Sequence, residues 1–142
     1  MDSEELLNIL RERMQGGLEG RLGIEISGVD GDCLLGQIRV SDGVSQPFGM
    51  LHGGALAAFA ESLGSCAGML RVDYPREICV GIELSISYMR GVKSGTVFGI
   101  AEPLKIGRSL HFWKVSMRDE GGREVAEARL TLMVRREDAA GD

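Results

Sequence analysis

Apolar residues recur at helical spacing along one long segment in the first half of the chain. The sequence predicts a helix between His52 and Leu70. Residues three or four apart form its apolar face, namely Leu56, Ala60, Leu63, Ala67 and Leu70. Because nearly its whole circumference is apolar, we expect this helix to be buried. A membrane span is the alternative, but a glutamate in mid-segment, several glycines and the lack of flanking basic clusters argue against it.

Six further segments alternate between apolar and polar residues, as half-buried strands do. Residues 22–27 and 34–40 flank the turn signal Asp30-Gly31 and predict a hairpin. The other four segments follow the central helix as residues 78–88, 96–104, 110–117 and 125–134. They predict a meander. The whole pattern predicts an α+β fold in which a strongly curved antiparallel sheet wraps around one long central helix.

The two ends of the chain are more polar. Residues 2–14 have the pattern of an amphipathic helix that Asp2 or Ser3 caps, and Gly16-Gly17 ends this N-terminal segment, 1–17. We expect the C-terminal tail, 136–142, to fray. The length of 142 residues predicts a single domain, 1–142.

Composition narrows the class of partner and the compartment. The formal net charge of −5 argues against a general nucleic-acid binder, but an anionic ligand is compatible with locally clustered Arg and Lys. Three cysteines in apolar contexts, Cys33, Cys66 and Cys79, indicate buried thiols in a reducing compartment. No signal peptide precedes them, so we expect a cytoplasmic protein. Since His52 and His111 are the only histidines and no zinc spacing occurs, we expect no metal.

Glu61 is the first candidate for chemistry. It is the only formally charged residue between Gly43 and Leu70, and Ser65 follows it by one helical turn. An unpaired buried charge is costly, and such carboxylates cluster at functional sites. A structural ion pair with an arginine or lysine is the alternative. No GxSxG, GxGxxG or GxxxxGK motif offers a competing site.

Four short motifs surround this glutamate at fixed spacing, namely Gln46-Pro47-Phe48-Gly49, His52-Gly53-Gly54, Ala60-Glu61-Ser62 and Ser65. With them the chain resembles the hotdog-fold acyl-CoA thioesterases, in particular the 4-hydroxybenzoyl-CoA, 1,4-dihydroxy-2-naphthoyl-CoA and phenylacetate-pathway enzymes. The resemblance covers roughly residues 20–135 and implies the hotdog fold.

The resemblance implies that Glu61 attacks the thioester carbonyl or activates water, and either role favours a carboxylate in dry surroundings. The backbone N–H of Gly53, at the first turn of the helix, would stabilise the oxyanion. His52, Gln46 and Ser65 would position the thioester or the water. Each has a plainer alternative: His52 caps the helix, Gln46 orders its loop, and Ser65 bonds the carbonyl four residues back.

The resemblance also places contacts to coenzyme A at two turns. It implies as contacts Arg90, Arg108 and Ser109, with Ser87, Tyr88 and Gly107 as lining residues. Guanidinium groups match phosphate geometry, so we expect the basic side chains to gather at one rim. The alternative is that they are ordinary solvated charges.

The sequence defines the acyl group of the substrate less well. The segment Ser85–Gly91, which borders the acyl pocket in the family, lacks the family's Asn or His in the strand and its Pro after the arginine. Phe48, Met50, Met69 and Tyr88 suggest a pocket for an aromatic or medium-length apolar acyl group, or they are plain core residues.

The resemblance finally implies a homodimer of hotdog units, usually doubled to a homotetramer, with sites that draw on two subunits and no cofactor besides the coenzyme A of the substrate. We expect neither nucleic acid nor membrane as a partner. A non-catalytic acyl-CoA sensor and a hotdog hydratase or dehydratase stay open as alternatives. A hydratase would require a different Asp/His pair on the helix.

Overall fold

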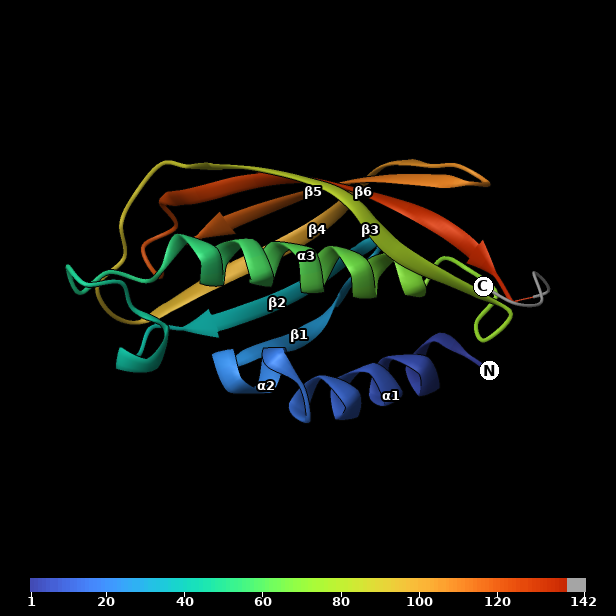
Figure 1. Cartoon of the computed structure of the whole chain (residues 1–142), viewed down its shortest axis with the longest axis horizontal. Helices are drawn as coiled ribbons and strands as arrows, with labels where there is room; N and C mark the ends of the chain where they lie inside the picture. Colours follow the sequence, from blue (N-terminus) through green and yellow to red (C-terminus); the bar gives the residue numbers. More distant parts are fainter. Residues whose placement is uncertain (138–142) are drawn as a thin grey trace.

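A curved antiparallel sheet wraps around one long helix in the computed structural model, which describes residues 1–137 (Figure 1). The helices are α1 Ser3–Gln15, α2 Leu18–Leu22 and α3 Gly53–Met69, with a short 3-10 turn Asp42–Val44. The strands are β1 Ile24–Asp30, β2 Cys33–Arg39, β3 Glu77–Tyr88, β4 Thr96–Ile106, β5 Leu110–Arg118 and β6 Glu124–Arg136. The predicted α+β arrangement is confirmed.

The strand order within the sheet is β1-β2-β4-β5-β6-β3. The predicted β1–β2 hairpin is confirmed, and β4, β5 and β6 form a meander. The prediction that all four later strands meander is wrong for β3, which pairs with β6 and lies at the edge of the sheet. One side of β3 therefore pairs with no strand among residues 1–137, a position that favours pairing with another strand.

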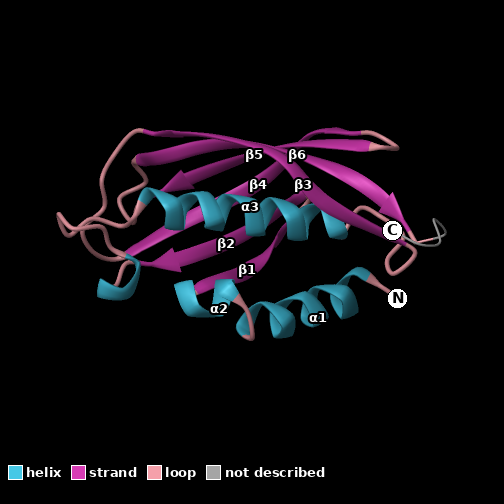
Figure 2. Ribbon diagram, viewed as in Figure 1, coloured by secondary structure: helices cyan, strands magenta, loops and turns pink. Residues whose placement is uncertain are grey.

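The sheet curves around α3 (Figure 2), and the side chains packed between helix and sheet form the core. Phe59 and Leu63 are fully buried on the helix face that meets β2 and β4. A Cβ added at Gly99 of β4 would lie 2.7 Å from Cζ of Phe59, and one at Gly36 of β2 would lie 2.8 Å from Cδ1 of Leu63. Glycine at these two strand positions is what lets the helix approach so closely.

The N-terminal helices cover one flank of α3. Asp2 and Glu5 form a capping box at the start of α1, and Met14 near its end lies against Cys66 of α3. Residue 22 was predicted to start a strand, but it ends α2. Gly23, at φ 75°, makes the left-handed turn that separates α2 from β1.

The C-terminal strand runs further than expected. Arg136 was predicted to belong to a frayed tail, yet it lies in β6 and its Nε donates to Oε1 of Glu77 at 2.9 Å. Residues 138–142 of that tail lie outside the described residues. Among the helices of residues 1–137, none is long and apolar enough to cross a membrane.

Candidate active site

The start of α3 presents an unpaired backbone amide. His52 is the N-cap, and its Nδ1 accepts a hydrogen bond from the N–H of Gly54 at 2.7 Å. The N–H of Gly53, the first of the helix, donates to no acceptor within residues 1–137. It points outward at the positive end of the helix dipole, which is where an anion or a developing oxyanion is stabilised.

The capping role of His52, given as the plainer alternative, is confirmed. Because Nδ1 is the acceptor, the proton of the neutral ring lies on Nε2. The exposed imidazole can therefore still donate from Nε2 toward a ligand.

Gln46 organises the loop before the helix. Its Oε1 accepts from the N–H of Phe48, and its backbone N–H donates to the carbonyl of Met50 at 2.7 Å. The loop-ordering role is thus confirmed. The side-chain NH2 of Gln46 has no partner within the described part of the chain. The imidazole of the N-cap is therefore a second donor next to Gly53, and the Gln46 amide lies in the loop that leads to the helix.

Glu61 departs from its predicted environment. Its side chain is exposed in this chain rather than buried, and it makes no ion pair or hydrogen bond with any described residue. The alternative of a buried ion pair is therefore wrong as well. Ser65, one turn later, is half-buried and makes no described hydrogen bond, so the proposed bond to the carbonyl four residues back is absent among residues 1–137.

Helix geometry separates Glu61 from Gly53. Eight residues of α-helix correspond to about 12 Å along the axis. A single thioester group cannot contact both the amide and the carboxylate of the same helix. The facing arrangement expected from the sequence does not form within one chain.

The basic residues do not gather at one rim of this chain. The end of β3 before Arg90 lies beside Ala126 of β6, whereas the turn with Arg108 lies beside Val134. Eight residues of strand separate these points by about 26 Å. That expectation is wrong for a single chain, and Arg90 and Arg108 occupy opposite ends of the sheet.

The other predicted contacts lie near these two ends. The N–H of Gly107 donates to the carbonyl of Leu110 at 2.8 Å, and a Cβ there would lie 2.7 Å from the same oxygen, so the turn requires glycine. The carbonyl of Ser109 accepts from the N–H of Val134, and Ser87 is exposed on β3.

A polar cavity of about 440 Å³ adjoins Arg90. Two acids and two further cations line it. The Nε of Arg123 is held by Asp119 at 2.9 Å, and the backbone N–H of Arg123, followed by its guanidinium, lowers the pKa of that carboxyl. Arg90 and Lys93 have no acidic partner among the described residues, so they are the cations left for an anionic ligand.

The candidate acyl-pocket residues split into two groups. Phe48 is 82% exposed at the tip of the Gln46 loop, and Tyr88 packs against Gly53. Met69 lies at the opposite end of α3, where its sulfur accepts from the N–H of Cys79 at 3.2 Å. Met69 therefore does not line a pocket beside the other two.

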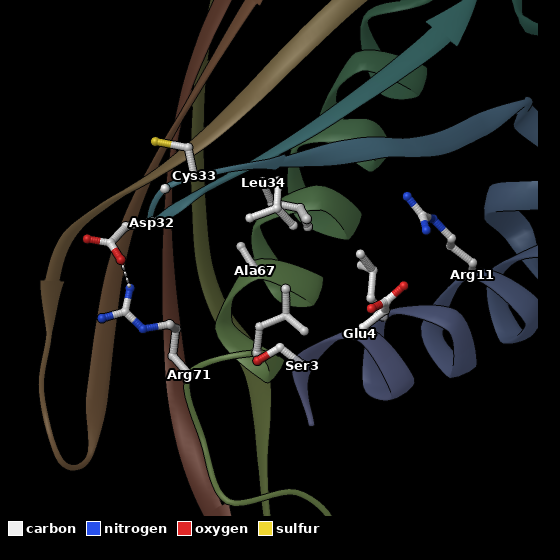
Figure 3. A pocket seen from close by; sticks show the side chains of 12 residues that line it. Ser3, Glu4, Arg11, Asp32, Cys33, Leu34, Ala67 and Arg71 are labelled. Carbon is white, nitrogen blue, oxygen red and sulfur yellow. Dashed lines mark ion pairs between the residues drawn. The ribbon is translucent and has the colours of Figure 1, made fainter. Parts of the chain in front are cut away.

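A second cavity, of about 630 Å³, lies between α1 and the end of α3 (Figure 3). It is enclosed by the first half of α1, the β1–β2 turn and the end of α3. Arg71 and Asp32 form an exposed ion pair at its edge, with Nη1 and Oδ1 3.6 Å apart. None of the predicted site residues lines it, so we assign it no part in the chemistry.

Three features of the site were missed from the sequence: Lys93, the contact of Tyr88 with Gly53, and the approach of Glu61 to Gly81. Only Gly81 carried a signal. A glycine inside a strand pattern marks a bulge or a close approach, and both occur there.

Comparison with known proteins places this geometry in a family. The thioesterase superfamily model matches residues 48–126. The proofreading thioesterase EntH of Cronobacter turicensis is 41% identical over 128 residues, which cover 90% of this chain and 93% of that protein. The 1,4-dihydroxy-2-naphthoyl-CoA hydrolase of Escherichia coli is 35% identical over 130 residues, which cover 92% of this chain and 93% of that protein.

A thioesterase crystal structure from Haemophilus influenzae matches with a TM-score of 0.91 at 33% identity, over 96% of this chain and 94% of that one. The fold is therefore the hotdog fold, as the resemblance implied. The chain belongs to the thioesterase superfamily and is a thioester hydrolase.

Proposed function

We propose that this thioesterase hydrolyses an acyl-CoA with an aromatic or medium-length apolar acyl group, releasing the free acid and coenzyme A. The observation that carries the proposal is the unpaired N–H of Gly53 at the exposed start of α3. It offers a donor to the thioester oxygen as negative charge develops there. Glu61 either attacks the carbonyl carbon, giving an acyl-enzyme that water then cleaves, or takes the proton of an attacking water.

A second copy of the chain brings these groups together in our proposal. Gly53, Ala57, Glu61 and Ser65 follow one another at four-residue spacing, so they share one face of α3. If two such helices pack antiparallel about a two-fold axis at Ala57, Gly53 lies opposite Glu61 of the partner subunit. The small side chain of Ala57 permits that close approach, and the exposed carboxylate of Glu61 becomes covered.

The free edge of β3 supports the same symmetry. Antiparallel pairing of β3 with its copy would place the end of one strand, with Arg90, beside the start of the other, near Arg108 of the partner subunit. The phosphates of coenzyme A would then meet cations from both chains. Partly exposed apolar side chains on the outer face of the sheet, Phe98, Ile100 and Phe112, favour a further pairing into a dimer of dimers.

The proposed reaction uses a carboxylate, an amide and water, and we propose no metal or redox cofactor. Three free cysteines fit a cytoplasmic location. A sensor or a hydratase has no specific observation in its favour.

The test is the variant Glu61→Ala assayed on aromatic and aliphatic acyl-CoA thioesters with a free-thiol reagent. We expect kcat/KM to fall by about 10³-fold or more, with unfolding unchanged, since Glu61 makes no hydrogen bond or ion pair with residues 1–137 that would be lost. Glu12→Ala, on the exposed side of α1, is the control and should retain full activity. Full activity in Glu61→Ala would refute the proposal.

A further inference from the structure

Two of the contacts between strand β3 and helix α3 lie at the proposed reacting groups. Tyr88, at the end of the strand, meets Gly53, and Gly81, in its middle, meets Glu61. Both inferences below rest on the proposed function, and each assigns β3 a positioning role that the sequence did not suggest.

The hydroxyl of Tyr88 donates to the carbonyl oxygen of Gly53 at 2.8 Å. The ring also covers this residue, since a Cβ added at Gly53 would lie 3.1 Å from Cζ of Tyr88. Two consecutive glycines, Gly53 and Gly54, begin the helix and have unusual backbone freedom. The peptide that carries the Gly53 N–H is held at its carbonyl, because that of His52 accepts from the N–H groups of Ala55 and Leu56. Tyr88 holds the next peptide, between Gly53 and Gly54, so the residue is fixed on both sides of its Cα.

We propose that Tyr88 is a positioning residue that holds Gly53, and with it the donor N–H, in place against β3 through this hydrogen bond, rather than a lining residue for substrate. Oxyanion stabilisation depends steeply on donor placement, and a shift of about 1 Å can cost about 10²-fold in rate. Loss of the hydroxyl should loosen the turn without removing the ring.

The experiment compares Tyr88→Phe with Tyr74→Phe in steady-state hydrolysis of several acyl-CoA thioesters. Tyr74 is the only other tyrosine, and its hydroxyl has no partner within residues 1–137. We expect Tyr88→Phe to lower kcat about tenfold for every acyl group with KM nearly unchanged, and Tyr74→Phe to match the wild type. An unchanged kcat, or a raised KM with normal kcat, would overturn the positioning role. A wild type without thioesterase activity would instead refute the proposed function.

Gly81 makes room for the Glu61 carboxylate. A Cβ added at Gly81 would lie 2.9 Å from Oε1 of Glu61, closer than such contacts are found. The register of β3 against β6 also shifts between Gly81 and Glu83, which marks a bulge beside the carboxylate. Bulges next to active sites redirect side chains.

The geometry points to Gly81 as a second positioning residue, whose missing side chain lets the carboxylate of Glu61 lie against the strand. The atom in the way is the end of a flexible side chain. A methyl group at position 81 would therefore displace the carboxylate and leave the fold intact.

A double-mutant cycle tests this contact. We expect Gly81→Ala to lower kcat about tenfold in the wild-type background, but much less in Glu61→Asp, whose carboxylate is one methylene shorter. Gly28→Ala is the matched control, because Gly28 also lies at a strand bulge and a Cβ there meets nothing within 4 Å. Equal losses in both backgrounds, or no loss in the wild type, would overturn the assignment. An inactive wild type would again count against the proposed function alone.

Discussion

The two ends of α3 are built in opposite ways. At its start, the N–H of Gly53 donates to no acceptor in the described part of the chain and lies beside the exposed cap His52. At its end, a Cβ added at Gly68 would lie 2.3 Å from Cδ1 of Leu132, which is fully buried. The start of the helix, which we call its open end, therefore carries an N–H with no hydrogen-bond partner among residues 1–137. The other end, its closed end, is packed tightly against the sheet.

Hydrogen bonding follows the same contrast. The carbonyls of Cys66 and Gly68 near the end of the helix accept from the N–H groups of Leu70 and Arg71. An amide without a protein partner is tolerated at the start of the helix because water reaches it. Substitutions at the open end should therefore change the reaction, and those at the closed end should change stability.

The largest expected effect is that of Gly53→Pro. Proline removes the N–H, and it suits this first helical position because no hydrogen bond is lost and His52 is already extended at ψ 134°. We expect kcat to fall by about 10²-fold to 10³-fold. Urea denaturation should show only a modest loss in the free energy of unfolding, because the added Cβ lies 3.1 Å from Cζ of Tyr88 and the ring must shift slightly. Normal turnover in a folded variant would rule out this amide as the oxyanion donor.

Gly68→Val should have the reverse signature. The added side chain meets Leu132 and the pair of Cys79 and His111, and overpacking of this kind costs about 2 kcal/mol. Chemical denaturation measures the loss, and kcat below the unfolding transition should stay normal. A stable variant would show that the closed end can relax.

A smaller effect is expected at the cap. His52→Ala should lower the free energy of unfolding by about 1 kcal/mol, because the N–H of Gly54 loses its acceptor. His52→Asn restores a cap and should recover that stability. If Asn also recovers full kcat, the imidazole has no role beyond capping.

The smallest expected effect is a dependence of the free energy of unfolding on pH. Burial lowers the pKa of His111 below its ordinary value of 6.5, Arg71 lowers it further, and Glu77 opposes them. Between the two pKa values the unfolded chain binds a proton that the folded chain does not. Stability is therefore full above pH 6.5 and falls as the pH decreases toward the folded pKa. The free energy of unfolding, measured with urea between about pH 7.5 and 5.5, should fall in this way in His52→Ala, where His111 is the remaining histidine. It should not do so in His111→Gln.

The strands and the central helix were predictable because their patterns are long and regular. Residues 78–88 alternate over almost the whole of β3, and His52-Gly53-Gly54 marks the start of α3 within one residue. Strand order was not predictable, since nothing local tells β3 to pair with β6 rather than β4. Leu22 was misplaced because its apolar side chain fits either the end of α2 or the start of a strand.

The predicted arrangement of the candidate site residues does not occur within one chain. Apolarity around Glu61 predicted burial, yet the sequence cannot distinguish burial within one chain from burial against a second copy. The same holds for Arg90 and Arg108, whose separation follows from strand register. Residue spacing selected these candidates. The distance between Gly53 and Glu61, and between Arg90 and Arg108, became clear only from the backbone.

The central claim is that each site combines Gly53 of one subunit with Glu61 of the other. Mixing Glu61→Ala chains with Gly53→Pro chains, each inactive alone, tests it directly. After unfolding and joint refolding, half of the dimers should be hybrids with one intact site of two, restoring about a quarter of wild-type activity. A refolded mixture that contains hybrid dimers yet stays inactive would contradict the account.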